Sequence, residues 1–412
     1  MTNTIHSLRA AMNPRLLAVL FLGFSSGLPL ALSSGTLQAW LADVDVDITA
    51  IGWFSLAGLP YTIKFLWAPL MDRFVPLPLG RRRGWMFVTQ IALLLAIVCM
   101  AFLTPESDLK LMGMLAFFIA FFSASQDIAF DAYRTDILHA PERGLGAAVS
   151  VAGYRLAMLI SGAGALIIAD YQGWKFAYLV MGGFMLVGMT TSFLCFQPAN
   201  ESRPGTLQAA IVEPFMEFIR RPFAIGLLVL IVFYKLGDAF AGTLTTAFLI
   251  KALEFSTSEV GVVNKGFGLA STLIGVFIGG ALMLKLGLFK SLLWFGVLQA
   301  VTNLGFMFLS VVGKNYLGMV LVIGLENLSG GMGTAAFVAL LMALCNQRYT
   351  ATQFALLSAL SAVGRVFVGP PSGMLVATTG WTTFFFLTFL LAIPGLVLLL
   401  AARKQLARYD ID

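Results

Sequence analysis

One short stretch, centred on a charged loop, decides how this chain folds: L-W-A-P-L-M-D-R-F-V-P-L-P-L-G-R-R-R, Leu66–Arg83. Its part from Asp72 onward carries this acid and a cluster of arginines, and it lies between two apolar runs, 49–71 and 85–104. Each run is as long as the roughly 20 apolar residues that cross a bilayer as a helix. The whole chain is 59% hydrophobic and 11% charged, against about 45–50% and about 25% in soluble domains. The stretch is therefore expected to be a loop between two spanning helices, and the composition excludes a soluble enzyme, a disordered protein and a disulfide scaffold.

The rest of the 412-residue chain follows the same pattern and predicts twelve spanning helices. They form two six-helix bundles, 1–196 and 223–412, joined by a polar linker, 197–222, that contains an amphipathic segment. The fold class is thus an all-α membrane protein. The expected spans are 15–40, 49–71, 85–104, 109–136, 144–169, 174–196, 223–250, 258–284, 288–311, 315–344, 350–376 and 380–402.

The basic residues predict the orientation. With the N-terminus in the cytoplasm, most loop Lys and Arg residues fall on the cytoplasmic side, and only Lys110, Lys175, Lys251 and Lys314 fall outside. Because cytoplasmic loops carry an excess of bases, both termini are expected in the cytoplasm. The same rule accounts for the net charge of +6, so no nucleic-acid partner is needed.

Metal and cofactor chemistry find no support in the residue types. The chain has 3 Cys and 2 His, and their spacing fits no metal site and no disulfide framework. No phosphate-binding loop of the G-x-x-x-x-G-K-[ST] type occurs. We expect no cofactor, no metal and no ATP hydrolysis within the chain.

Six helices, a cytoplasmic linker and six more helices resemble the layout of the major facilitator superfamily, in which substrate binds near the midplane between the halves. Asp72-Arg73 followed by Gly80-Arg81-Arg82-Arg83 resembles that superfamily's D-R-x-G-R-R loop, with a longer spacer. The resemblance implies a cytoplasmic gate formed by Asp72 and Arg73, with Gly27 in a breakable stretch of the first helix. The alternative is that the arginines only anchor the loop to the membrane surface.

Charged residues inside a bilayer cost roughly 2.5–3.5 kcal/mol each and are default functional candidates. The deep acids are Asp127, Asp131, Asp238 and Glu326. They fall on the fourth, seventh and tenth helices, which line the cavity in the superfamily. All four are candidates for proton coupling.

The fourth helix places Asp127 and Asp131 four residues apart, on one face. Two carboxylates in a low-dielectric site cannot both stay charged cheaply, so one is expected to hold a proton. The neighbouring Gln126 is a candidate donor and acceptor for substrate. Alternatively, Asp131 only neutralises Arg134 or Arg155.

On the seventh helix, Lys235 and Asp238 are three residues apart, so they form either a substrate-binding pair or a purely structural ion pair. Tyr234 is a candidate for stacking on a sugar ring. On the tenth helix, Asn327 follows Glu326 and is a candidate for hydrogen bonding to substrate. The remaining substrate-binding candidates are polar residues in or near the expected helices: Gln38, Lys64, Arg155, Asn264, Lys265 and Arg365. The four bases in this list have alternative roles. Lys265 and Arg365 could pair with Glu326 or bond backbone carbonyls, and Lys64 and Arg155 could face the fourth helix.

Stretches spread over nearly the whole chain resemble the AmpG-type muropeptide permease family of the superfamily. They include F-S-S-G-L-P-L-A-L-S-S-G-T-L-Q-A-W (24–40), S-A-S-Q-D-I-A-F-D-A-Y-R-T-D (123–136), Y-K-L-G-D-A-F (234–240), E-V-G-V-V-N-K (259–265), E-N-L-S-G-G-M-G-T (326–334) and A-T-Q-F-A-L-L-S-A-L-S-A-V-G-R-V (351–366).

The resemblance implies import of GlcNAc-1,6-anhydro-MurNAc and its peptides across a bacterial inner membrane, driven by the proton gradient. It also implies roles in cell-wall recycling and β-lactamase induction. The expected partners are the anhydromuropeptide, protons and the lipid bilayer, and the chain is expected to be a monomer. Two alternatives stay open: a transporter for another anionic solute, such as an acetyl-CoA-like compound or a siderophore, and a non-transporting membrane sensor. An enzyme is not expected, because no Ser/His or metal constellation lies within the helices.

Overall fold

The computed structural model describes residues 13–46, 54–198 and 204–407. All regular elements in these ranges are helices, and none of these residues forms a strand. Nine helical stretches among them are long and apolar enough to cross a membrane. Helices satisfy all their backbone hydrogen bonds internally, which a bilayer requires. The expected all-α, multi-pass membrane protein is therefore confirmed.

The chain divides into two compact units. Unit 1 comprises 1–138, 149–215 and 345–356, and unit 2 comprises 139–148, 216–344 and 357–412. The expected division into 1–196, 197–222 and 223–412 stays a prediction.

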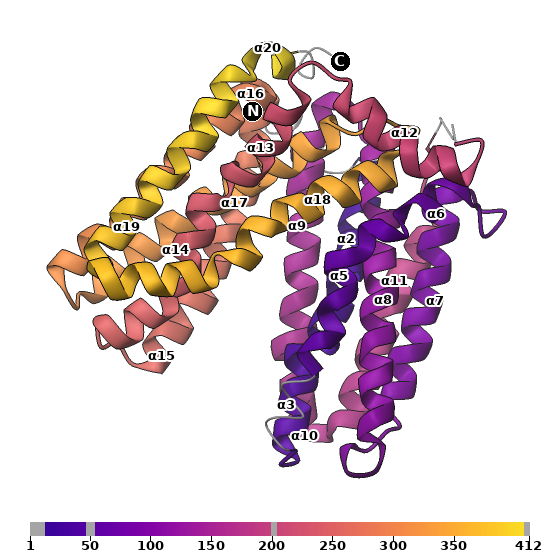
Figure 1. Ribbon diagram of the computed structural model, residues 1–412. Helices are drawn as coiled ribbons and strands as arrows, with labels where there is room; N and C mark the ends of the chain where they lie inside the picture. Colours follow the sequence, from indigo (N-terminus) through magenta and orange to yellow (C-terminus); the bar gives the residue numbers. More distant parts are fainter. Residues whose placement is uncertain (1–12, 47–53, 199–203, 408–412) are drawn as a thin grey trace, which may run out of the picture. The chain divides into compact units, whose positions relative to one another are not determined.

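The helices are distributed over both units as follows (Figure 1). Unit 1 holds α2 (Pro14–Leu32), α3 (Gly35–Asp43), α5 (Leu59–Ile63), α6 (Ala68–Arg73), α7 (Arg81–Met100), α8 (Pro105–Ile137), α10 (Ala165–Gln172) and α11 (Trp174–Leu194). Unit 2 holds α13 (Ala224–Tyr234), α14 (Leu236–Ala247), α15 (Thr257–Val260), α16 (Gly268–Val312), α17 (Tyr316–Ala343), α19 (Gly369–Ala401) and α20 (Arg403–Leu406). Residues of both units occur in α9 (Arg143–Leu159), α12 (Leu207–Ile219) and α18 (Thr350–Phe367). Short 3₁₀ and π segments are η1 (Ser55–Gly58), η2 (Lys64–Leu66), η3 (Ala140–Glu142), η4 (Ile160–Gly164), η5 (Phe248–Ala252) and η6 (Gly261–Phe267).

The nine long stretches differ from the expected twelve spans for local backbone reasons. The described part of the run 49–71 is split into η1, α5, η2 and α6. Pro60 lies in the first turn of α5, and Pro69 lies in the first turn of α6. Proline lacks the N–H that a continuous helix needs, so it favours such breaks. Two expected spans share Gly261–Val312, where Gly287 has φ +74° and interrupts the helix. Gly380, with φ +77°, similarly interrupts α19.

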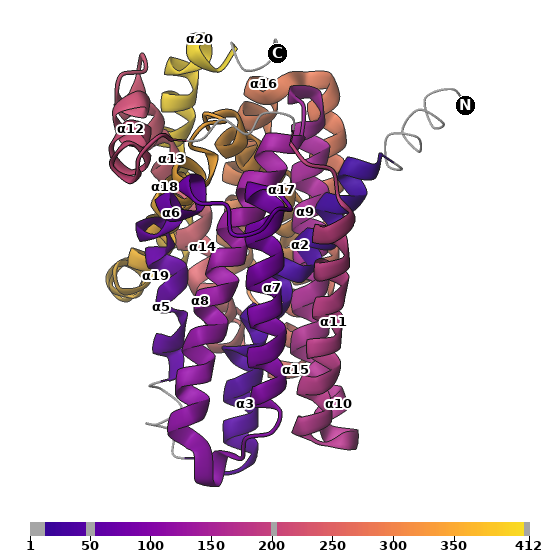
Figure 2. The same cartoon turned by 90° about the vertical axis from the view of Figure 1, so that its right-hand side faces the viewer.

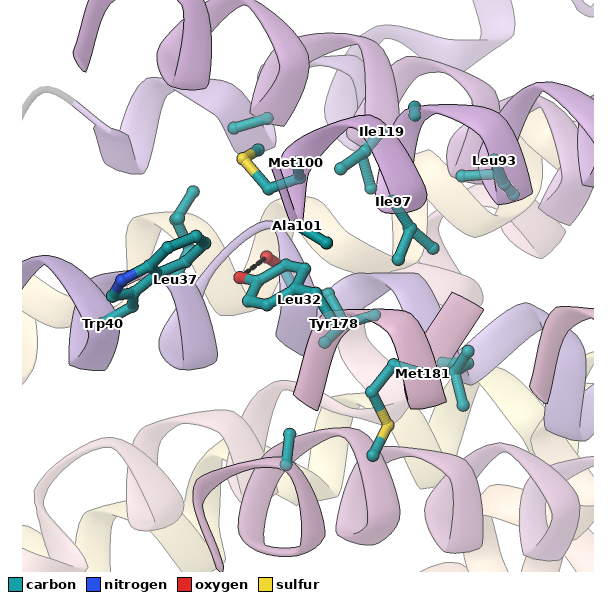
Figure 3. Close-up of a cluster of buried hydrophobic side chains, with 14 of the residues drawn as sticks. Leu32, Leu37, Trp40, Leu93, Ile97, Met100, Ala101, Ile119, Tyr178 and Met181 are labelled. Atoms are coloured by element: carbon teal, nitrogen blue, oxygen red, sulfur yellow. Dashed lines mark hydrogen bonds between the residues drawn. The ribbon is translucent and has the colours of Figure 1, made fainter. Parts of the chain in front are cut away.

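In unit 1, α2, α7, α8 and α11 lie side by side (Figures 1 and 2). Their apolar side chains and Trp40 of α3 belong to one buried cluster (Figure 3). The Trp174 ring packs against this cluster and stacks on Trp40, with ring centroids 5.7 Å apart. Tyr178 lies in the same cluster, and its hydroxyl donates to the Leu32 carbonyl at 2.9 Å. This packing fixes α2 against its neighbours and positions its polar residues, which include Ser26, beside α8.

In unit 2, α16 and α17 approach closely through glycines. A Cβ on Gly275 would lie 2.0 Å from the Leu328 carbonyl oxygen, and one on Gly331 would lie 2.3 Å from the Thr272 carbonyl oxygen. Larger residues would push the helices apart, as at other small-residue interfaces in membranes. The close contact places the polar residues of α17 within reach of Thr272.

Candidate functional site

The two acids of α8 have different surroundings in unit 1. Asp131 forms ion pairs with Arg134, 2.8 Å from Nη2 to Oδ1, and with Lys64, 3.7 Å from Nζ to Oδ2. Asp127 accepts a hydrogen bond from Ser26 Oγ at 2.5 Å. No ion pair is found for Asp127 in the described part of the chain. Asp131 is therefore in direct ion-pair contact with two cations, whereas Asp127 contacts no described cation.

Both bases that contact Asp131 are fixed by further contacts or by burial. Arg134 is 7% exposed, and its guanidinium lies 5.3 Å and 5.0 Å from the ring centroids of Phe130 and Phe354. Its Nη1 donates to Ser150 Oγ at 2.8 Å. The Lys64 side chain, on η2, is 12% exposed. Burial of both cations beside Asp131 supports a permanent charge cluster at this point of unit 1.

Gln126 points away from Asp127 into the helix packing. Its Nε2 donates to Ser25 Oγ at 3.1 Å, and Gln90 Nε2 donates to the same oxygen at 3.5 Å. Ser192 Oγ donates to Gln90 Oε1 at 2.8 Å. All four side chains are at most 1% exposed. The geometry favours a role of Gln126 in joining four helices over direct substrate contact, and nothing in the sequence pattern singled out Gln90 or Ser192.

The two other substrate candidates of unit 1 have few contacts. Gln38 lies on α3 and is half-buried. Arg155 lies on α9, is exposed, and forms no ion pair with any described residue. Neither residue contacts Asp131. The bases that pair with Asp131 are Lys64 and Arg134, and Arg155 is not one of them.

Unit 2 contains a second group of charges. Lys235, between α13 and α14, lies 3.3 Å from Asp238, measured from Nζ to Oδ2. Glu326 on α17 lies within electrostatic reach of both residues, and its Oε2 accepts a hydrogen bond from Asn327 Nδ2 at 2.9 Å. No ion pair of Glu326 occurs among the described residues. The second unit thus also combines one paired and one unpaired carboxylate.

The amide side chains near this group bond to neighbouring helices. Asn327 also donates to the Ile323 carbonyl at 2.9 Å and accepts from Thr272 Oγ1 at 3.0 Å. Asn264, on η6, donates to Thr246 Oγ1 at 3.3 Å. Asn264, Asn327 and Thr272 are half-buried, Ile323 is buried, and Thr246 is exposed. The Asn264 contact can therefore be exchanged for a ligand more readily than the Asn327 contacts.

Tyr234 is placed in the core of unit 2. It is 7% exposed, its hydroxyl donates to the Leu292 carbonyl at 2.9 Å, and its ring stacks on Phe337 at 5.5 Å. This geometry favours a packing role over stacking on a sugar. The side chains of Lys265 and Arg365 lie outside the described residues.

Asp72 is fully buried in unit 1 and accepts hydrogen bonds from two segments. Its Oδ1 lies 2.9 Å from Arg82 Nη1 and 3.3 Å from the Ala351 backbone N. Its Oδ2 accepts from the Thr352 backbone N at 2.8 Å and from the Thr352 hydroxyl at 2.7 Å. Arg82 also pairs with Asp136, at 2.8 Å. A carboxylate thus caps the N-terminus of α18, where free N–H groups and the helix dipole favour negative charge.

The other two gate candidates have different contacts. The Arg73 guanidinium lies 5.8 Å from the ring centroid of Phe74. Gly27 lies where α2 packs against α9, because a Cβ there would be 2.4 Å from the Tyr154 carbonyl oxygen. Arg82, rather than Arg73, is the arginine paired with Asp72, and the sequence pattern alone did not separate the two.

Among the described residues, no group of three or more His, Cys, Asp or Glu side chains is arranged to hold a metal ion. The arrangement offers carboxylates that can exchange protons, bases that can meet anionic groups, and hydroxyl and amide groups that can form hydrogen bonds.

Comparisons with known proteins agree with this fold and these residues. The sequence profile of the Major Facilitator Superfamily matches residues 19–368. The anhydromuropeptide permease of Escherichia coli (strain K12) is 53% identical over 401 residues, which cover 97% of this chain and 82% of that protein. The AmpG 4 transporter of Rickettsia felis is 34% identical, over 95% of this chain and 97% of that protein.

Solved structures show the same fold at low sequence identity. The transporter FucP in its outward conformation gives a TM-score of 0.73 at 12% identity, covering 95% of this chain and 99% of that chain. The proton:xylose symporter XylE gives 0.69 at 13% identity, covering 95% of both chains. The superfamily consists of transporters rather than enzymes. The chain is therefore a transporter that belongs to the Major Facilitator Superfamily, in one family with the AmpG-type permeases.

Proposed function

We propose that this protein imports GlcNAc-1,6-anhydro-MurNAc and its peptides into the bacterial cytoplasm by proton symport and alternating access. The observation that carries the proposal is the 53% identity to an anhydromuropeptide permease over 97% of the chain. The same proposal includes twelve spanning helices in two bundles, an inner-membrane location, cytoplasmic termini and a monomer. The imported anhydromuropeptide would enter cell-wall recycling and β-lactamase induction.

Asp127 is the proposed proton carrier of unit 1. Transport of a proton requires a group that is stable both charged and neutral. Asp131 contacts two cations, so neutralising it would leave a buried excess of positive charge, which is costly. Asp127 has one hydroxyl donor and no described ion pair, so its neutral form leaves no uncompensated cation. This difference supports Asp127 over Asp131.

Glu326 has the corresponding place in unit 2. Asp238 is paired with Lys235, whereas Glu326 accepts a hydrogen bond from the neutral Asn327. We propose that Lys235 meets a carboxylate of the substrate peptide and that Asp238 holds the lysine when no substrate is bound. Asn264, whose hydrogen bond to Thr246 is long and exposed, is the proposed partner for substrate amides or hydroxyls.

The gate is proposed to close when Asp72 caps α18. The capping bonds to Ala351 and Thr352 support this role, because they tie α6 to a helix start some 280 positions away in sequence.

The proposal is tested by uptake of labelled GlcNAc-1,6-anhydro-MurNAc-tripeptide into right-side-out vesicles, with and without an imposed proton gradient. The protein should accumulate substrate only with the gradient. Asp127→Asn should abolish accumulation yet retain exchange of internal for external substrate, since exchange needs no net proton movement. Asp131→Asn is the matched control: it should lower both activities together, because it disrupts a charge cluster needed in every step.

Uptake that ignores the gradient would refute symport and leave facilitated diffusion. A well-folded protein that moves no anhydromuropeptide, but moves another anionic solute, would refute the substrate. Asp131→Asn losing only gradient-driven uptake, with Asp127→Asn unaffected, would reverse the assignment of the two acids.

A further inference from the structure

Two buried hydroxyls close to Asp127 lack a well-aligned hydrogen bond to any described residue. They are Tyr61 Oη on α5 and Ser123 Oγ on α8. Ser123 is completely buried, and Tyr61 lies next to the hydroxyls of Ser123 and Ser33 and within electrostatic reach of Asp127. Buried polar groups without partners are rare in folded proteins and call for an explanation.

The hydroxyls lie on one side of Asp127. Ser123 precedes Asp127 by four residues on α8, so the two side chains share a face and Ser123 lies one turn nearer the Pro105 end. Ser33, the residue that follows the end of α2, lies seven residues after Ser26, about two helical turns away from the residue that bonds Asp127. In the proposed orientation, this side of Asp127 faces the outside of the cell.

Asp127 itself has a free acceptor. Ser26 donates to Oδ1, and Oδ2 accepts no hydrogen bond from any described residue. The two hydroxyl groups and this carboxylate oxygen would together supply the two to four polar partners that a buried water molecule needs.

Besides Tyr61 on α5, the charged and titratable groups around Asp127 come from three elements. Lys64 on η2 and Asp131 and Arg134 on α8 form the charge cluster one turn further along α8. Tyr154 and Arg155 on α9 also lie within electrostatic reach of this region. Lys64 and Arg134 are bound to Asp131, and Arg155 is exposed.

We propose that Tyr61 and Ser123 hold a water molecule against Asp127, and that this water delivers the transported proton. The inference rests on the proposed proton coupling. The water donates one proton to Asp127 Oδ2 and accepts one from the solvent chain on the outer side, so it is regenerated. Tyr61 and Ser123 are positioning residues: they orient the water and keep their own protons.

The test compares Tyr61→Phe, Ser123→Ala and the double variant with the unchanged protein. Tyr171→Phe, at an 82% exposed position on α10, is the matched control. Gradient-driven uptake should slow by about 100-fold in the double variant, the range that proton transfer through a positioned group contributes. Substrate exchange without a gradient should stay within about twofold of the unchanged protein, because exchange does not require Asp127 to change protonation.

A spectroscopic readout separates proton delivery from a structural defect. The infrared C=O band of protonated Asp127, identified by its loss in Asp127→Asn, should move to higher frequency in Tyr61→Phe, since the carboxyl loses its water partner. The control variant should leave the band in place. Uptake and band both unchanged in the double variant would overturn the water route while leaving symport intact. Gradient-independent uptake by the unchanged protein would instead refute the proposed symport, and the route with it.

Discussion

Replacing Asp72 with Asn tests whether one buried carboxylate holds the start of α18. The substitution keeps the size of the side chain and replaces one oxygen by an amide NH₂ group. That group is a donor and would face the Thr352 N–H and hydroxyl, which both donate to Asp72 Oδ2, at 2.8 Å and 2.7 Å. Two charge-assisted hydrogen bonds are therefore lost together.

The size of the effect follows from these contacts. Hydrogen bonds to charged groups contribute about 1.5–3 kcal/mol each, but these two share one acceptor atom, and Arg82 keeps its second partner, Asp136. We therefore expect a net loss of about 3 kcal/mol, the lower end of the range for breaking a buried ion pair. At 1.4 kcal/mol per factor of ten, local opening of the α18 start becomes about 100-fold more frequent.

Amide hydrogen exchange measures this opening directly. The Ala351 and Thr352 amides donate to Asp72, so the peptide 345–357 should lose about 100-fold protection in Asp72→Asn. Asp170→Asn, at an exposed position on α10, is the control and should exchange as the unchanged protein does. Equal protection in both variants would show that the cap contributes nothing, and would refute the reasoning on which the gate is based.

Two further changes test the helix packing and a loop cap. Gly27→Ala brings a Cβ to 2.4 Å from the Tyr154 carbonyl oxygen, so thermal unfolding in detergent should show that overpacking lowers the free energy of unfolding by about 2 kcal/mol. The control Gly183→Ala, whose Cβ would have nothing within 4 Å, should be neutral. Equal stability of the two variants would contradict the close contact. Hydrogen bonds from the Ser256 backbone N–H and hydroxyl hold the pKa of the Glu259 carboxyl below its ordinary value. The contribution of Glu259 to the cap of α15 should therefore be complete above about pH 4.5 and disappear as the pH falls through the lowered pKa. Amide hydrogen-exchange protection of α15 that stays constant down to pH 3, or that is the same in Glu259→Gln, would refute this.

The sequence predicts which charges share a helix but not which of them are compensated. The spacing of Asp127 and Asp131 places both on one face of α8 from the period of the helix alone. The difference between them depends on Lys64, which lies on a separate segment 3.7 Å from Asp131. Such a contact follows from tertiary packing, and no local pattern contains it.

The direction in which the Gln126 side chain points could have been predicted from the sequence. Consecutive residues of an α-helix point about 100° apart, so Gln126 and Asp127 cannot both face the same site. The structure accordingly directs Gln126 toward Ser25 and Asp127 toward Ser26. Adjacent polar residues on a spanning helix are therefore better assigned to different neighbours.

The difference between the expected spans and the long helical stretches comes from local backbone geometry rather than from hydropathy. Hydropathy identifies apolar runs well, because a helix in lipid must satisfy its own backbone. It does not register where prolines split the run 49–71, or where Gly287 and Gly380 take positive φ values. These residues decide whether a run is one straight helix, two helices or several short ones.

The two units deal with buried acids in the same manner, and this narrows the search for the transport chemistry. Of the four acids considered for proton coupling, one in each unit contacts a base, Asp131 in the first and Asp238 in the second. Among the described side chains, the other acid, Asp127 or Glu326, accepts its hydrogen bond from an uncharged donor. A paired acid gains its stability from its charge and resists protonation, whereas an acid bonded to neutral groups can change its charge without leaving a cation behind. Variants at the paired acids should therefore affect the stability of the helices that they join, and variants at the unpaired acids should affect the coupling of transport to protons.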